Sequence, residues 1–141
     1  MSADKVFVDT NILVYAHDAA AGEKHSRAKA LVSQIWNDRC GVLSTQVLQE
    51  FYVNIRKKAA APVGTAEAKQ WLTDYLSWEI VTNDGNAVIE AIDLEERYQV
   101  SFWDALILHA AHSAGASVVY SEDLNHGQQY ADLVVRNPLL E

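Results

Sequence analysis

Five short apolar runs constrain the fold of this chain more than any other feature of its sequence. They lack the polar alternation of a strand that has one face in water, so each is typical of a strand covered on both faces. Such strands belong to parallel sheets, in which crossover helices cover both sides. The runs are Val6–Val8, Gly41–Leu43, Ile80–Val81, Ser117–Tyr120 and Leu133–Val135.

Between these runs, apolar residues recur at the spacing of amphipathic helices. The segment Ser101–Ala114 is apolar almost all round, which predicts a central buried helix, and Ser101 and Asp104 have the spacing of a capping box. We therefore predict an α/β fold, a three-layer α/β/α sandwich with a central parallel sheet, formed by residues 1–141 as a single domain. The helical stripes are centred on Ala28–Trp36, Val47–Ile55, Trp71–Leu76 and Ala87–Tyr98.

Composition narrows the class of protein. Half of the residues are apolar and 21% are charged, which excludes a disordered chain or a fibrous repeat. The lone Cys40 cannot form an internal disulfide, the first residues lack a signal-peptide pattern, and no apolar run reaches the length of a membrane span. We therefore expect a cytoplasmic protein with no membrane partner.

The charge balance bears on nucleic-acid binding. A formal net charge of −8 argues against binding that is driven by a broad basic surface. Two local basic groups remain candidates, Lys24 with Arg27 and Lys29, and Arg56–Lys58, although both also fit ordinary solvated helix faces. Acids gathered at one site would weaken the objection, because a bound divalent cation inverts the local field.

Four acidic residues are predicted to meet at one edge of the sheet. Asp9 directly follows the first strand, and Asp123 follows a later one after two residues. Asp104 lies in the first turn of its helix, and Glu50 lies about one turn into the helix after GVLS. In parallel sheets the strands end and the following helices begin at the same edge, where ligands bind. The sequence therefore predicts that four carboxylates converge there.

Such a cluster requires compensation, since like charges a few ångströms apart repel one another and raise one another's pKa. Mg²⁺ or Mn²⁺ fits best, because both are hard cations that prefer carboxylate and water oxygens. Zinc fits poorly, because the single cysteine and the scattered histidines lack zinc-motif spacing. Those histidines are His17, His25, His109, His112 and His126; His126 is also a candidate for reaching the edge.

Each acid also has a purely structural interpretation. Asp104 could only cap its helix, Asp9 could be an N-cap, and Asp123 could begin a turn with Glu122. Glu50 lies opposite the apolar stripe of its helix, so periodicity alone would leave it in solvent. The case for a site therefore rests on the convergence of the four.

Over nearly its whole length the chain resembles PIN domains, and within that family the VapC-type toxins of bacterial toxin–antitoxin pairs. The segment VFVDTNILVY carries the D-T-N opening as Asp9, Thr10 and Asn11, and VLQEF supplies Glu50. Asp104 comes from FWDALI. Asp123 comes from VVYSEDLNHGQ, with Ser121 at the small hydroxyl position two residues before it.

The resemblance implies a Mg²⁺- or Mn²⁺-dependent endoribonuclease that cleaves RNA by a metal-activated water. It also implies a homodimer and a cognate antitoxin that blocks the site. By the same resemblance, Asp9, Asp104 and Asp123 would hold the metal, with Glu50 completing the set or acting on the water. Thr10, Asn11 and Ser121 would hold the carboxylates in place.

Two other classes of function remain open from the sequence. A phosphatase or a phosphorylated receiver domain also uses acids at this edge. However, a haloacid-dehalogenase-type phosphatase needs a second Asp at the position where this chain has Asn11. A receiver domain needs paired acids after its first strand. A non-catalytic PIN-like binding module would be favoured if one of the four acids were missing, and none is.

Overall fold

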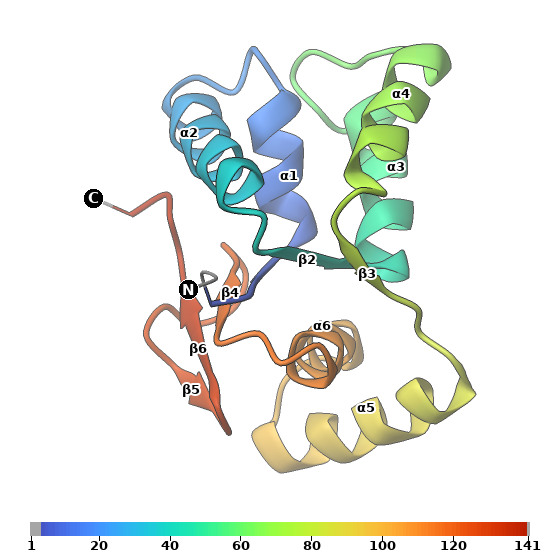
Figure 1. The fold of residues 1–141 in the computed structure, drawn as a ribbon, viewed down its shortest axis with the longest axis vertical. Helices are drawn as coiled ribbons and strands as arrows, with labels where there is room; N and C mark the ends of the chain where they lie inside the picture. Colours follow the sequence, from blue (N-terminus) through green and yellow to red (C-terminus); the bar gives the residue numbers. More distant parts are fainter. Residues whose placement is uncertain (1–3, 141) are drawn as a thin grey trace.

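The computed structural model describes residues 4–140, in which one sheet has the strand order β3-β2-β1-β4-β6-β5 (Figure 1). The strands are β1 (Val6–Val8), β2 (Gly41–Ser44), β3 (Glu79–Val81), β4 (Val118–Tyr120), β5 (Gln129–Tyr130) and β6 (Leu133–Arg136). The helices are α1 (Thr10–His17), α2 (Glu23–Asp38), α3 (Thr45–Lys57), α4 (Thr65–Tyr75), α5 (Gly85–Tyr98) and α6 (Phe102–Ser113).

All five predicted strands are present, and they pair in parallel. Strand β5 was not predicted, and it pairs antiparallel with β6, so the prediction of a parallel sheet is wrong at this edge. Two residues are too few to produce an apolar pattern, and the tight turn before β6 needs Ala131 at a positive φ of 52°. The apolar segment of α1 was also not predicted as a helix.

Helices cover both faces of the sheet (Figure 1). Helices α1 to α4 lie on one side, and α6 lies on the other with α5 packed against it. Helix α6 buries Ala105–Leu108, Ala110 and Ala111, as its almost wholly apolar sequence predicts. None of the helices within residues 4–140 is long and apolar enough to cross a membrane.

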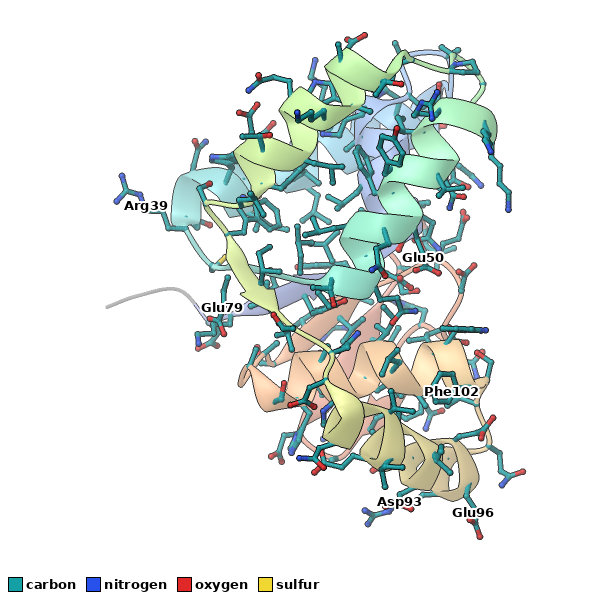
Figure 2. The ribbon with its side chains drawn as sticks, turned by 90° about the vertical axis from the view of Figure 1, so that its right-hand side faces the viewer. Arg39, Glu50, Glu79, Asp93, Glu96 and Phe102 are labelled. Carbon is teal, nitrogen blue, oxygen red and sulfur yellow. The ribbon has the colours of Figure 1, made fainter. Side chains whose placement is uncertain are left out.

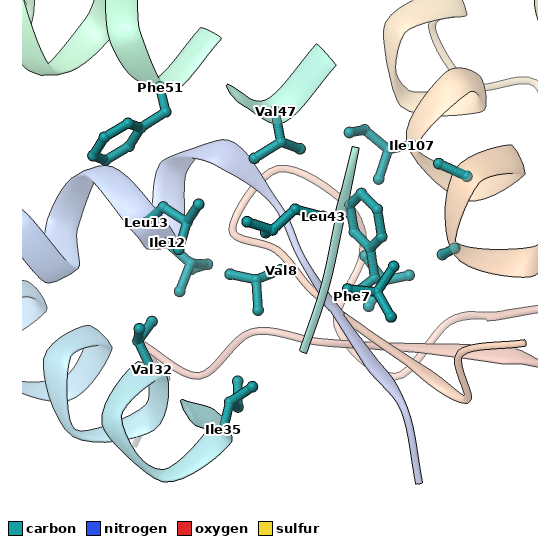
Figure 3. Packing of buried hydrophobic residues seen from close by; sticks show 14 of the residues in the cluster. Phe7, Val8, Ile12, Leu13, Val32, Ile35, Leu43, Val47, Phe51 and Ile107 are labelled. Carbon is teal, nitrogen blue, oxygen red and sulfur yellow. The ribbon is translucent and has the colours of Figure 1, made fainter. Parts of the chain in front are cut away.

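The central strand β1 feeds both halves of the core, because successive side chains of a strand point to opposite faces. Phe7 faces Ile107 on α6, whereas Val8 faces Ile12 on α1 and Val32 on α2 (Figure 3). Phe7 and Val8 are both fully buried. This double burial holds β1 at the centre of the core, and the chain leaves the sheet directly after it, at Asp9.

The start of β2 carries a strict size constraint, from which we make a stability prediction. A Cβ atom at Gly41 would lie 2.3 Å from Cε3 of Trp78, a buried ring that would have to shift. Gly41→Ala is therefore expected to destabilise the fold by about 1–3 kcal/mol, the usual cost of overpacking. Urea unfolding followed by circular dichroism measures the change.

Gly85 provides the matched control, because it occupies the first turn of α5 and a Cβ there meets no atom within 4 Å. Gly85→Ala should leave stability unchanged or raise it by about 0.5–1 kcal/mol, through the reduced entropy of the unfolded chain. Equal effects of the two substitutions would contradict the packing of Trp78 on β2.

Candidate active site

The predicted acids lie where the strand order reverses direction. From β1 the chain adds β2 and then β3 toward one edge of the sheet, and it then crosses back to place β4 on the other side of β1. In open α/β sheets this switch point opens a crevice at the carboxyl ends of the strands. Asp9 directly follows β1, and its backbone N–H donates to the Tyr120 carbonyl at the end of β4 (2.9 Å).

Asp9 is the buried centre of the site. Asp9 is 5% exposed, and both of its carboxylate oxygens accept hydrogen bonds. Oδ1 accepts from the backbone N–H of Thr10 (2.7 Å), and Oδ2 accepts from Oγ of Ser121 (2.8 Å). The N-cap interpretation of Asp9 is therefore correct as far as it goes, but the cap leaves lone pairs on both oxygens for a further ligand.

Burial raises the pKa of Asp9 to about 7. The hydrogen bonds from Ser121 and Thr10 act in the opposite direction, and the charges of Asp123 and Glu50 add to the increase. The fold thus holds a carboxylate where its negative charge is unfavourable. A nearby cation would reverse that balance.

Thr10 links Asp9 to Glu50, since its Oγ1 donates to Oε1 of Glu50 (2.9 Å) while its backbone N–H binds Asp9. Glu50 on α3 is half-buried, although the periodicity of its helix alone predicts exposure. The contact joins residues 40 positions apart, so helical periodicity could not predict it. Of the three predicted supporting residues, Thr10 is therefore one that lies between two carboxylates.

Ser121 links Asp9 to Asp123. Its Oγ donates to Asp9 and accepts from the backbone N–H groups of Asp123 (3.1 Å) and Leu124 (3.4 Å). Ser121 is fully buried, whereas Asp123 is exposed. The hydroxyl therefore fixes the turn that presents the Asp123 carboxylate at the edge.

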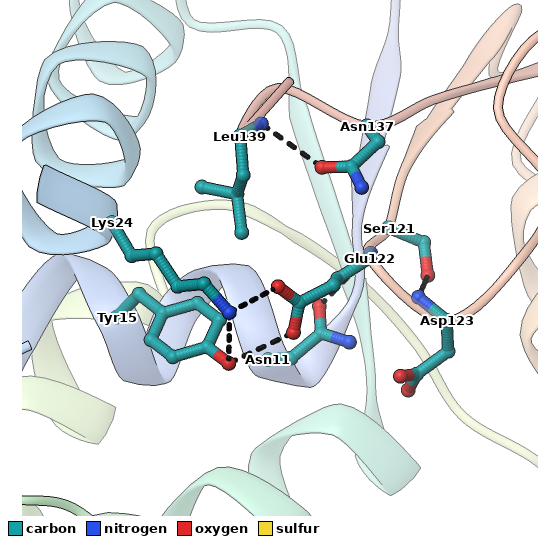
Figure 4. A network of polar contacts seen from close by, with 8 residues as sticks. All are labelled: Asn11, Tyr15, Lys24, Ser121, Glu122, Asp123, Asn137 and Leu139. Atoms are coloured by element: carbon teal, nitrogen blue, oxygen red, sulfur yellow. Dashed lines mark hydrogen bonds and ion pairs between the residues drawn. The ribbon is translucent and has the colours of Figure 1, made fainter. Parts of the chain in front are cut away.

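The neighbouring acid, Glu122, points away from Asp123 (Figure 4). Its carboxylate accepts from Oη of Tyr15 (2.8 Å) and from Nζ of Lys24 (2.7 Å). Asn11 assists, because its Oδ1 accepts from the backbone N–H of Glu122 (3.4 Å). Sequence reasoning did not identify this Tyr15–Lys24–Glu122 contact, and the three residues share no motif. Asn11 thus supports the turn beside the carboxylates, and its contact with a carboxylate stays a prediction.

Asp104 begins α6, where its backbone N–H donates to Oγ of Ser101 (3.0 Å), as the capping pattern predicts. The residue is half-buried. Its pKa is raised mainly by burial, with Ser101 opposing and the charge of Asp123 contributing. The electrostatic coupling to Asp123 places Asp104 within the field of the other acids. The four acids thus form a chain of contacts and charges from Glu50 through Asp9 and Asp123 to Asp104.

The donor chemistry of this edge fits a divalent cation of the Mg²⁺ or Mn²⁺ type. Two of the carboxyl groups have raised pKa values caused partly by their neighbours, and within residues 4–140 no lysine or arginine forms an ion pair with any of the four. No three acidic, histidine or cysteine side chains of the described residues stand close enough together to enclose a metal ion as they are. The residue types fit the ion, and a closed set of ligands would require side chains to turn inward.

The histidines and basic residues considered as candidates contact groups other than the four acids. Nδ1 of His109 contacts Glu90 on α5 (3.2 Å), and Nδ1 of His126 accepts from the backbone N–H of Asn137 (2.9 Å). In the first basic group, Lys24 binds Glu122 and Arg27 binds Glu23 (2.8 Å). These cations therefore contact carboxylates of the protein, which agrees with the solvated-face interpretation.

A model of the PIN domain family matches residues 6–131. A comparison with curated proteins finds no match. Three solved structures share the fold at 16–20% identity, which establishes the fold alone.

The first is VapC20 of Mycobacterium tuberculosis, a toxin that cleaves the sarcin–ricin loop. It has a TM-score of 0.66 and 20% identity, and the match covers 84% of this chain and 90% of that chain. The second is a toxin–antitoxin complex from Klebsiella pneumoniae, with a TM-score of 0.68 and 16% identity; the match covers 95% of this chain and 98% of that chain. The third is DNA-bound VapBC from Salmonella typhimurium, with a TM-score of 0.61 and 18% identity; the match covers 96% of this chain and 99% of that chain.

Proposed function

Because this chain belongs to the PIN domain family, we propose that it is a Mg²⁺- or Mn²⁺-dependent endoribonuclease. One observation carries the proposal: the buried Asp9 is tied through Ser121 to Asp123 and through Thr10 to Glu50, and no lysine or arginine of residues 4–140 forms an ion pair with these acids. A structural cap alone would not require two further acids linked to it. A site for a divalent cation would.

In this proposal Asp9, Asp104, Asp123 and Glu50 hold the cation. When bound, the cation lowers the pKa of a coordinated water and stabilises the negative charge that develops on the phosphoryl oxygens. Thr10 fixes Glu50 through Oε1 and leaves Oε2 free to orient the attacking water and accept its proton. Ser121 holds Asp9 and Asp123 in place at the same time.

We further propose that the protein is the toxin of a type II toxin–antitoxin pair, with a homodimeric toxin and a cytoplasmic location. Support comes from the similar structures, which include toxin–antitoxin complexes with nearly whole-chain coverage. The four carboxylates also suit an antitoxin that inserts an arginine, whose fork binds carboxylates bidentately without a metal.

The family match disfavours a phosphatase or a receiver domain, since neither is a PIN domain. A non-catalytic PIN-like module remains the second candidate. Unlike the enzyme, such a module would bind RNA or protein and cleave nothing under any metal condition.

A cleavage assay tests the proposal. We expect purified protein to cleave RNA with Mg²⁺ or Mn²⁺ and to stop when EDTA is in excess, because carboxylates alone supply no electrophile. Where a small antitoxin-like reading frame lies immediately upstream of this gene, addition of its purified product should also stop cleavage. Restoring the metal should recover activity only in the sample without that product.

Protein and RNA concentrations stay fixed in all arms, and circular dichroism checks that EDTA leaves the fold intact. Full cleavage in excess chelator would rule out the metal mechanism. Cleavage that persists at its full rate with the neighbouring product bound would rule out the antitoxin. RNA binding without cleavage in every metal would favour the non-catalytic module.

A further inference from the structure

Trp103 is an exposed aromatic residue directly beside one of the acids. Its side chain is 62% exposed, whereas Ala105–Leu108 on the same helix are buried. It lies between Asp104 and Phe102, whose ring it meets edge-on at 5.2 Å between centroids. Figure 2 shows Phe102 at the start of α6 on the same side of the molecule as Glu50. Single exposed apolar residues are common on protein surfaces, so exposure alone indicates nothing here. The relevant feature of Trp103 is its position next to Asp104.

The backbone of Trp103 is held by α3. Nε2 of Gln46 donates to the Trp103 carbonyl (3.3 Å), and because a carbonyl only accepts, this contact fixes which end of the amide faces Trp103. Oε1 of Gln46 then has no hydrogen-bond partner, although the residue is 6% exposed. Gln46 lies one helical turn before Glu50, on the same face of α3.

A second amide oxygen without a partner lies beside the same helix start. Oδ1 of Asn83, which follows β3, is buried without a hydrogen bond. The backbone N–H of Asn83 donates to Oγ1 of Thr45, the residue before Gln46 (3.2 Å). Buried acceptors without donors are rare in folded proteins. Both oxygens are buried beside the start of α3, the helix that holds the backbone of Trp103.

The charges at the carboxylate edge of the sheet indicate how an RNA would be bound there. The protein carries a formal net charge of −8, and the nearby carboxylates have no basic partners among residues 4–140. Attraction to phosphate therefore contributes little at this edge without a cation. Stacking of a base on an aromatic ring is independent of charge, and it is a general means of binding unpaired nucleotides.

From these observations, and resting on the proposed ribonuclease function, we propose that Trp103 stacks on an unpaired base of the RNA, at a nucleotide flanking the cleaved phosphate. The substrate class is then RNA that is single-stranded or looped at this nucleotide, since paired bases do not offer a free face. A protein partner would instead cover Trp103 together with exposed apolar residues of α5 such as Ile89.

RNA binding in EDTA tests the stack independently of cleavage. Fluorescence anisotropy of a labelled single-stranded RNA is measured for wild type, Trp103→Ala, Trp103→Phe and Ile89→Ala, the last a control with 61% exposure. The RNA is then scanned with one abasic nucleotide at a time. Trp103→Ala should weaken binding about 5- to 150-fold, as expected for the loss of one stacked base, and Trp103→Phe should retain most of the affinity. Ile89→Ala should have no effect.

The abasic scan supplies the specific signature. One abasic position should weaken wild type as much as Trp103→Ala does, and should weaken Trp103→Ala no further. With Mg²⁺ the same variant should raise KM more than it lowers kcat. Unchanged RNA affinity, or losses that add at every abasic position, would overturn the stack. So would light scattering in which Trp103→Ala dissociates an oligomer. If wild type binds but never cleaves, the proposed function fails and the binding data still decide the role of Trp103.

Discussion

Asp9→Asn is expected to lower the rate of RNA cleavage by about 100- to 1000-fold, the usual effect of removing one electrostatic element of an active site. Asp9 is linked through hydrogen bonds to both Glu50 and Asp123, so loss of its charge weakens the part of the site that the other acids share. Asparagine keeps the shape of the side chain and an acceptor for the Thr10 N–H. Initial rates at saturating Mg²⁺ measure the effect.

Asp93→Asn is the matched control, because Asp93 is exposed on α5 and lies far from Glu50 (Figure 2). It removes the same charge from the chain and should leave the rate unchanged. Circular dichroism must show that both variants are folded. An Asp9→Asn protein that cleaves at the wild-type rate would show that the site is wrongly assigned.

Most of the fold could be predicted from local patterns, because burial on two faces leaves a direct signature in each strand. Residues Val6–Val8 have only apolar side chains, so either face can meet a helix. Strand β5 left no such signature, since Gln129 is exposed and only Tyr130 is buried. Its pairing depends on the turn and on β6, which are tertiary features.

The sequence predicted the acids at the edge, but not how they are held. Glu50 belongs to the site through a hydroxyl 40 residues away, and no helical pattern contains that information. Glu122 and Asp123 are adjacent acids, and only the structure shows that Tyr15 and Lys24 bind the first and leave the second free. The roles of these residues in catalysis stay predictions.

The free energy of unfolding should respond to Asp9→Asn in a way that depends on pH. The pKa of Asp9 is about 7 in the folded protein and 3.8 in the unfolded chain. Between these values the folded state binds more protons, so the contribution of Asp9 to stability falls as the pH rises through this window and is constant outside it. The total loss by pH 8 is about 4 kcal/mol at most.

Asparagine does not titrate, so this loss is absent from the variant. Its amide instead places a donor against Ser121, whose Oγ already accepts from two backbone N–H groups, and this costs about 1 kcal/mol at every pH. Asp9→Asn should therefore be less stable than wild type near pH 4 and more stable near pH 8. Urea unfolding in EDTA at low salt, from pH 4 to 8.5, measures the difference.

The difference between the two proteins isolates Asp9. The half-buried His17, whose pKa is lowered to about 4, changes stability in the opposite direction over part of the same range, but it does so equally in both proteins. Asp93→Asn should follow wild type at every pH. A difference between Asp9→Asn and wild type that is independent of pH would show that Asp9 is ionised at no cost, and the electrostatic account of the site would fail.

The same unfolding experiment with Mg²⁺ tests whether Asp9 is a metal ligand. At pH 7.5 millimolar Mg²⁺ should raise the stability of wild type by RT ln(1 + [L]/Kd), because the ion binds only where the folded chain brings the carboxylates together. If Asp9 is a ligand as proposed, Asp9→Asn lacks that ligand and its charge, so its gain should be much smaller. The measured quantity is the difference between the gains in stability that Mg²⁺ gives the two proteins. Any effect of asparagine on folding that does not depend on the metal cancels in this difference. Equal stabilisation of the two proteins by Mg²⁺ would exclude Asp9 as a ligand, whatever the cleavage assay shows.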